Sequence, residues 1–148
     1  MYGAVLWMHS WLRWVVLLLG IFATVQLLVQ VYRRSPEPRT RLYTLFIRLL
    51  GLQFLFGALL HVHLSPIVDA ALVDWRAAMG DPALRFFFVE HPFGMFFAVG
   101  AAHFGWIRLG RDLRWHRPAA IAQVVWLILT VVSIPWPFLA YGRALFRL

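Results

Sequence analysis

The sequence has no cysteine and no lysine, and it has few acidic residues. Without cysteine, disulfide bonds and thiolate metal ligands are excluded, so a soft metal would have to bind through histidine or methionine. All 14 basic residues are arginine, against 6 acidic residues, which gives a formal net charge of +8. In so apolar a chain, this excess indicates membrane orientation and not a nucleic-acid partner.

Charged surface is scarce as well. Of the 148 residues, 62% are hydrophobic and only 14% are charged, with a mean hydropathy of +0.74. A chain of this composition cannot cover itself with a water-soluble surface, so most of it must face lipid. The composition predicts an integral membrane protein whose main partner is the lipid bilayer.

Four long apolar runs follow one another along the chain. They span about residues 4–31, 42–64, 86–107 and 119–139. Each is long enough to cross a hydrocarbon core of roughly 30 Å as a helix. Short links join antiparallel neighbours, so we expect an all-α, up-down four-helix transmembrane bundle that forms a single membrane domain over residues 1–148. The first run lacks a cleavage site and is expected to be a retained helix.

The links between the runs differ in charge. Residues 33–41 and 108–117 each carry four arginines against one acid, whereas residues 65–85 carry three aspartates against two arginines. The positive-inside rule places the two arginine-rich links in the cytoplasm, and the second link and both termini outside. This orientation suits a bacterial inner membrane. Within the second link, residues 67–79 have the pattern of a short helix in the interface.

Polar residues in the apolar runs fall into two layers. The outer layer contains His9, Arg13, His61, His63, Glu90 and His91. The inner layer contains Gln26, Arg48, His103 and Gln123. On the third run the two layers are separated by about 18 Å of helical rise. Ionisable groups at membrane depth are costly without partners, so these layers are the candidate functional sites.

Spacing within the outer layer suggests partners. His9 and Arg13 share one helix face at i, i+4, and His61 shares a face with Gln53 on the second run. His63 points away from His61 and is expected at the headgroups, as is the loop residue His116. An unpaired Arg13 would cost several kcal/mol at this depth, so we expect a buried ion pair between Arg13 and Glu90.

Three chemistries suit this set of side chains. Facing imidazoles in a four-helix bundle can ligate haem b, with arginines near its propionates. Alternatively, His9, His61, His91 and Glu90 supply the ligand types of a non-haem metal site. A quinone or porphyrin pocket with phenylalanine walls is the third. The alternative to all three is that the chain binds no cofactor and is an accessory subunit, whose partners would be other membrane subunits.

Four segments of the chain resemble a family of small four-helix membrane proteins, common in Bacteroidetes-type bacteria and often labelled "cytochrome b". The segments are His9-Ser-Trp-Leu-Arg-Trp14, Gln53 with Gly57 and Ser65-Pro66, Arg85-Phe-Phe-Phe-Val-Glu-His-Pro92, and Ile134-Pro-Trp-Pro137. The early histidine is also similar to that of the haem-binding protoporphyrinogen oxidase of the HemJ type. The resemblance implies a fold and a haem. The absence of lysine departs from the family's lysine-rich loops.

The sequence therefore predicts a haem b or related tetrapyrrole-binding membrane protein that takes part in electron transfer; a membrane oxidoreductase activity is compatible with this cofactor. The predicted cofactor-binding residues are His9, His61, His91, His103, Arg13 and Arg48. His9 and His91 are the expected axial ligands because their helices are diagonal in an up-down bundle, and His61 is the substitute. Pro92 is the weak point, because it could place His91 in an extended turn before the helix.

Overall fold

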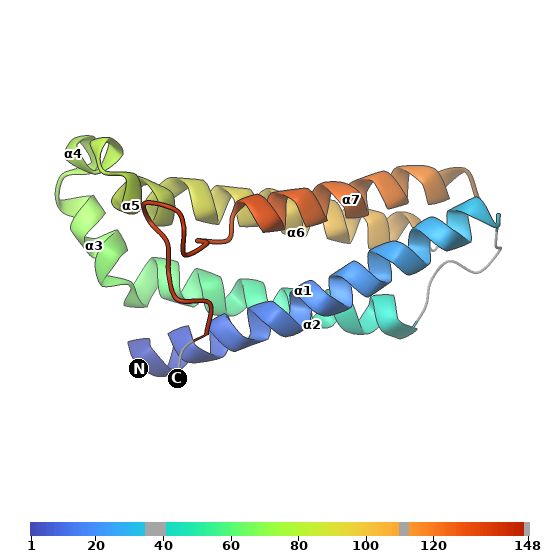
Figure 1. The fold of residues 1–148 in the computed structure, drawn as a ribbon, viewed down its shortest axis with the longest axis horizontal. Helices are drawn as coiled ribbons and strands as arrows, with labels where there is room; N and C mark the ends of the chain where they lie inside the picture. The colour runs from blue at the N-terminus through green and yellow to red at the C-terminus, as the bar shows by residue number, and fades with distance from the viewer. Residues whose placement is uncertain (35–40, 110–112, 147–148) are drawn as a thin grey trace.

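The computed structural model describes residues 1–34, 41–109 and 113–146 (Figure 1). Over these residues the chain is helical and contains no strand. The elements are α1 (Tyr2–Tyr32), α2 (Arg41–Leu59), the π-helical η1 (Leu60–Leu64), α3 (Pro66–Val73), α4 (Trp75–Gly80), α5 (Pro82–Arg85), the π-helical η2 (Phe86–Glu90), α6 (His91–Leu109), the short 3-10 helix η3 (Leu113–Trp115) and α7 (His116–Val132). The predicted all-helical class is confirmed.

Two of the helical stretches are long and apolar enough to cross a membrane. They are Tyr2–Tyr32 and Arg41–Leu64, with mean hydropathies of 2.2 and 1.9 over their best windows. Neither contains proline, which would remove a backbone donor and kink the helix. The bounds of both agree with the apolar runs predicted at 4–31 and 42–64 to within two residues.

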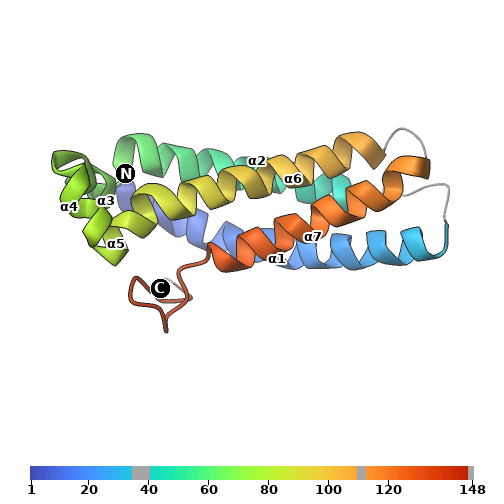
Figure 2. The ribbon, with the colours of Figure 1, turned by 90° about the horizontal axis from the view of Figure 1, so that it is seen from above.

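The four long helices form an elongated antiparallel bundle. α1 packs against α2 and α7, and α6 packs against α7 and α2, so α1 and α6 face each other diagonally. One end of the bundle holds the start of α1, helices α3–α5 and residues 133–146; we call it the terminal end (Figures 1 and 2). The opposite end holds Tyr32, Arg41, Leu109 and His116, and we call it the arginine end.

The last helix is shorter than predicted. The expected span 119–139 was wrong at its end, because α7 stops at Val132. Pro135 lacks the N–H that would bond the carbonyl of Val131, so a helix cannot continue normally there. The Val131 carbonyl instead accepts from the indole Nε1 of Trp136 at 2.9 Å. Residues 133–146, which we call the C-terminal segment, leave the bundle axis and turn back over the terminal end.

The single interfacial helix predicted at 67–79 is also wrong. The structure has three short helices there, α3, α4 and α5, each beginning after a capping residue. The Asp74 carboxylate accepts from Arg76 N and Ala77 N, at 3.1 and 3.0 Å. Ser65 and Asp81 cap α3 and α5 in the same way. Capping side chains favour non-helical backbone at their own position, so they divide the stretch into separate helices.

The middle of the bundle is closed by one tryptophan. Trp126 of α7 is fully buried, and its ring meets Phe46 of α2 edge to face, with the ring centroids 4.6 Å apart. Gly20 of α1 leaves room for the same indole, because a β-carbon there would overlap the Trp126 ring. Closer to the arginine end, the hydroxyl of Tyr43 donates to Gln123 Oε1 at 2.8 Å.

Gly20→Ala should destabilise the bundle. The added methyl must displace the rigid Trp126 ring, and such overpacking costs about 1–3 kcal/mol. Gly51→Ala is the matched control, because its β-carbon meets nothing within 4 Å and alanine favours helix. Thermal unfolding in detergent, followed by circular dichroism, measures both. Equal melting temperatures for the two variants would contradict this packing.

Candidate functional site

Two histidines from diagonal helices meet across the bundle axis. His9 of α1 and His91 of α6 have ring centroids 6.5 Å apart, with an angle of 79° between the ring planes. Both lie near the terminal end, because α1 begins at Tyr2 and α6 begins at His91. Pro92 does not displace His91, since the π-helical η2 runs directly into α6 and keeps His91 helical. The structure therefore brings the two predicted axial ligands together.

The His91 ring is oriented by the end of α7. Its Nδ1 lies 2.8 Å from the carbonyl oxygen of Ser133. A carbonyl only accepts, so Nδ1 carries the proton and Nε2 keeps a lone pair. In a helix, the Ser133 carbonyl would bond the N–H of residue 137, but that residue is proline. The paired prolines therefore leave this acceptor available to His91.

His9 lies against α2. Its ring fits there because Gly57 has no side chain: a β-carbon at Gly57 would lie 3.1 Å from His9 Cε1. The Gln53 amide nitrogen donates to the His9 carbonyl at 3.0 Å and lies 3.4 Å from His9 Nε2. His9 Nδ1 is buried and makes no hydrogen bond with any described residue. It is thus a ring nitrogen in the interior without a partner.

His61 borders the same site from the π-helical η1. Its ring stacks on Phe88, with centroids 6.3 Å apart and an angle of 24° between planes. The wider π-turn changes which residues face inward at the end of α2, and such turns are frequent at functional sites. His63 is exposed, as the two-residue spacing predicted. Of the two histidines on η1, only His61 lines the cavity described next.

A cavity of about 480 Å³ lies among α1, α2, α6 and α7 at the terminal end. Its walls are mostly apolar, and its basic lining residues are His9, His61, His91, Arg13 and Arg143. None of the described residues that line it is an aspartate or glutamate. The volume is in the range of pockets that hold drug-sized ligands and cofactors. The cavity therefore suits a largely apolar ligand that carries acidic groups, a metal ion, or both.

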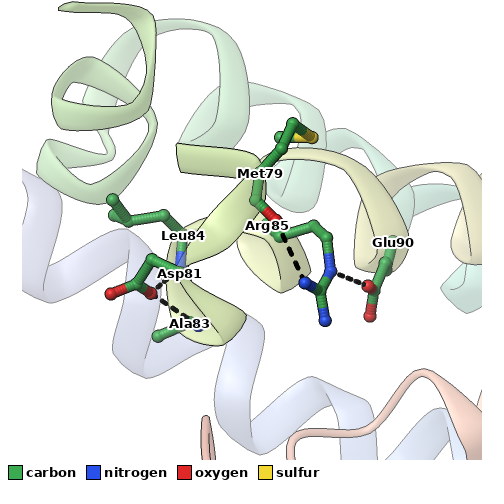
Figure 3. A network of polar contacts seen from close by, with 6 residues as sticks. All are labelled: Met79, Asp81, Ala83, Leu84, Arg85 and Glu90. Carbon is green, nitrogen blue, oxygen red and sulfur yellow. Dashed lines mark hydrogen bonds and ion pairs between the residues drawn. The ribbon is translucent and has the colours of Figure 1, made fainter. Parts of the chain in front are cut away.

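The predicted Arg13–Glu90 pair is wrong. Glu90 pairs with Arg85, whose Nε lies 2.6 Å from the carboxylate, and the two side chains are 43% and 40% exposed (Figure 3). Arg85 also donates from Nη1 to the Met79 carbonyl at 3.1 Å. Because η2 is a π-helix, Arg85 and Glu90 at i, i+5 lie on one face. The carboxylate therefore stays at the surface, where it avoids the free-energy cost of desolvation.

Arg13 instead contacts the C-terminal segment. Its Nη2 donates to the Leu145 carbonyl at 3.0 Å, and the indole of Trp14 donates to the same oxygen at 3.0 Å. The guanidinium also lies over the Trp14 ring, 4.9 Å from its centroid. Backbone carbonyl and aromatic face thus replace the predicted carboxylate as partners of this cation.

In the part of the chain that the structure describes, the predicted inner-layer ligands Arg48 and His103 lie apart from the cavity. Arg48 is exposed on α2, and His103 Nδ1 donates to the carbonyl of Val99 one turn earlier, at 2.9 Å. Neither lines the cavity. His116, expected in the interface, is buried at the start of α7. The ligand roles predicted for Arg48 and His103 stay predictions, and neither residue takes part in the cavity.

The C-terminal segment contributes site residues that sequence reasoning missed. The Tyr141 ring stacks on Phe86, with centroids 3.9 Å apart and planes 15° apart. Arg143 lies over Phe87, 4.9 Å from its centroid, and lines the cavity. No spacing in the sequence indicates that Arg143, which lies beyond the last helix, contacts the cavity at the terminal end. The available signal is the pair Pro135 and Pro137, because a helix ends or kinks at proline.

Comparison with protein families, curated proteins and solved structures finds no significant match to this chain. The resemblance to proteins labelled cytochrome b stays a prediction. Among the residues that the structure describes, no three histidine, aspartate or glutamate side chains gather closely enough to hold a metal ion. The four-ligand set proposed for a non-haem metal is not assembled, because Glu90 faces the surface with Arg85. Function must be argued from the cavity itself.

Double-mutant cycles should separate the two candidate ion pairs. Arg85 and Glu90 should show a coupling below about 1 kcal/mol, because exposed ion pairs contribute little. Arg13→Leu and Glu90→Ala should be additive, since the two side chains do not contact. The measurement is the free energy of unfolding in detergent. A coupling between Arg13 and Glu90 above that between Arg85 and Glu90 would contradict the geometry.

Proposed function

We propose that the chain binds haem b, or a related tetrapyrrole, between His9 and His91 and takes part in electron transfer. The observation that carries the proposal is the approach of the two imidazoles, 6.5 Å between centroids. A metal bonded to two imidazole nitrogens at about 2 Å holds the ring centroids roughly 6 Å apart, since each nitrogen lies about 1 Å from its ring centre. The centroid separation is close to this value. The nitrogen edge of His9 lies beside Gly57 and Gln53 of α2, so this ring would have to turn toward His91 to bind the metal.

The polar atoms of the pair fit a metal-centred ligand. His91 has its Nδ1 proton bonded to a carbonyl, the arrangement that usually accompanies metal ligation through Nε2. His9 has a buried ring nitrogen that makes no hydrogen bond among the described residues. Burying such a nitrogen without a partner is costly, so a ligand in the cavity would relieve it. His61, on the same cavity, is the substitute ligand.

The protein's own groups would position and shield the cofactor. Bound haem supplies a one-electron carrier whose potential depends on its axial ligands. The hydrogen bond to the Ser133 carbonyl would hold the ring plane of His91 and leave its Nε2 available for the metal. Arg13 and Arg143 place two positive charges on the cavity wall, where they suit the acidic side chains of a tetrapyrrole. The apolar walls exclude water from the site.

We also propose that all four long helices cross the bilayer of a bacterial inner membrane. η2 and α6 form one continuous stretch, Phe86–Leu109, which at 1.5 Å per residue is about 36 Å long. Their lipid-facing sides are apolar, since Phe93, Phe96 and Phe97 are each 60% exposed. The arginine end would face the cytoplasm, because Arg33, Arg34, Arg41, Arg108, Arg114 and Arg117 lie there.

Purified protein from haem-sufficient cells should show a haem b spectrum. His9→Ala and His91→Ala should each abolish it, because each removes one axial ligand. His63→Ala and His116→Ala are the controls, since neither residue lines the cavity. Absorption spectra of the oxidised and dithionite-reduced protein measure the outcome. A protein without a Soret band, or a band that survives loss of both His9 and His91, would reject the haem and favour the cofactor-free accessory subunit.

Reporter fusions test the orientation. The positive-inside rule predicts that a reporter at the C-terminus works outside the cytoplasm, and one inserted within residues 35–40 works inside it. Alkaline phosphatase and green fluorescent protein, each fused at both places, give opposite signals for the two compartments. Phosphatase activity at 35–40 with fluorescence at the C-terminus would invert the proposed topology.

A further inference from the structure

The cavity has a second set of polar atoms beyond the histidine pair. Among the described residues, Trp126 Nε1 and Thr130 Oγ1 are buried and make no hydrogen bond, and both residues line the cavity. Their exposed fractions are 0% and 8%. Buried polar groups nearly always have partners in native structures, and a group without one costs of the order of 1–3 kcal/mol. Two such groups on residues of one cavity wall are candidate donors to a bound ligand.

The two side chains share a face of α7. Their spacing of i, i+4 stacks them on adjacent turns, as in Trp126 and Thr130. Ser133, which orients His91, is the residue directly after the end of α7. By helical rise, Thr130 lies about 5 Å and Trp126 about 10 Å further from the terminal end than Ser133. A planar ligand between His9 and His91 would therefore present its inner edge to this face.

The chemistry of the pair defines the group that it binds. The indole N–H can only donate, and the threonine hydroxyl can donate as well. We propose that Trp126 and Thr130 bind a carbonyl oxygen on the inner edge of a conjugated ring in this cavity. A carbonyl oxygen has two lone pairs and can accept from both donors. The inference rests on the proposed tetrapyrrole site and narrows its ligand: the ring would carry a carbonyl at this edge, where haem b has only vinyl and methyl groups.

Two ring systems carry such an oxygen, a carbonyl-substituted tetrapyrrole and a quinone. Matched iron porphyrins test the first: diacetyldeuterohaem has two ring carbonyls where mesohaem has ethyl groups, and both keep iron and two propionates. Decylubiquinone tests the second. Binding of each probe to the purified protein is measured by absorbance or fluorescence titration.

Thr130→Val is the decisive variant, because it removes the hydroxyl without changing side-chain shape. Thr24→Val is the matched control, since Thr24 is buried in α1 but its hydroxyl already donates to the Gly20 carbonyl at 2.7 Å. Thr130→Ser keeps a hydroxyl at the site. The ligand-free Thr130→Val protein should melt no lower than wild type, because it loses an unsatisfied polar group.

Wild type and the Thr24→Val variant should bind diacetyldeuterohaem about tenfold more tightly than mesohaem, as expected for one or two neutral hydrogen bonds. Thr130→Val should lose that preference, and Thr130→Ser should retain most of it. Equal binding of the two porphyrins by wild type, or a preference unaffected by Thr130→Val, would show that water satisfies the donors and would overturn the inference while leaving the haem proposal intact.

Titration with decylubiquinone tests the carbonyl site independently of the haem proposal. Binding of decylubiquinone that weakens about tenfold in Thr130→Val, without binding of either porphyrin, would support the carbonyl site and reject the haem. Failure of wild type to bind any of the three probes would reject both proposals.

Discussion

The hydrogen bond between His91 Nδ1 and the Ser133 carbonyl is the interaction on which the rest of the site depends. It exists because Pro137 cannot supply the N–H that a continuing helix would give to Ser133. Pro135 acts in the same way two residues earlier and ends α7 at Val132. The same backbone interruption thus frees the acceptor and releases the C-terminal segment, which returns to place Arg143 and the Leu145 carbonyl beside the cavity.

Close approach of α6 and α7 is the second requirement. A β-carbon at Gly94 would overlap the Ser133 side chain, so the glycine allows the last turn of α7 to reach His91. Gly57 of α2 has the same function for His9 of the neighbouring α1. Small residues in apolar helices are usually explained by packing alone. Here the packing also determines where two imidazoles lie, because each ring occupies or borders space that a methyl group would fill.

The helical class and the bounds of the first two long helices could be predicted from the sequence, because the length of an apolar run is a local property. The meeting of His9 and His91 followed from that topology. The predictions that were wrong, the Arg13–Glu90 pair and the end of the last helix, depended on local backbone geometry. The π-turn of η2 placed Arg85, and not Arg13, beside Glu90, and i, i+4 reasoning has no rule for such a turn. The return of residues 133–146 depends on non-local stacking, such as Tyr141 on Phe86, which no periodic pattern encodes.

The position of the cavity limits what the proposed cofactor would do. His9 is seven residues into the chain from Tyr2, about 10 Å by helical rise, whereas Tyr32 at the arginine end is about 35 Å away. The imidazole between these levels, His103, is bonded to its own helix and lies outside the cavity. If the proposed haem is bound between His9 and His91, it lies close to the terminal end. An electron carrier held there would exchange electrons with partners at that end, and a route across the bundle would require a second cofactor on another subunit.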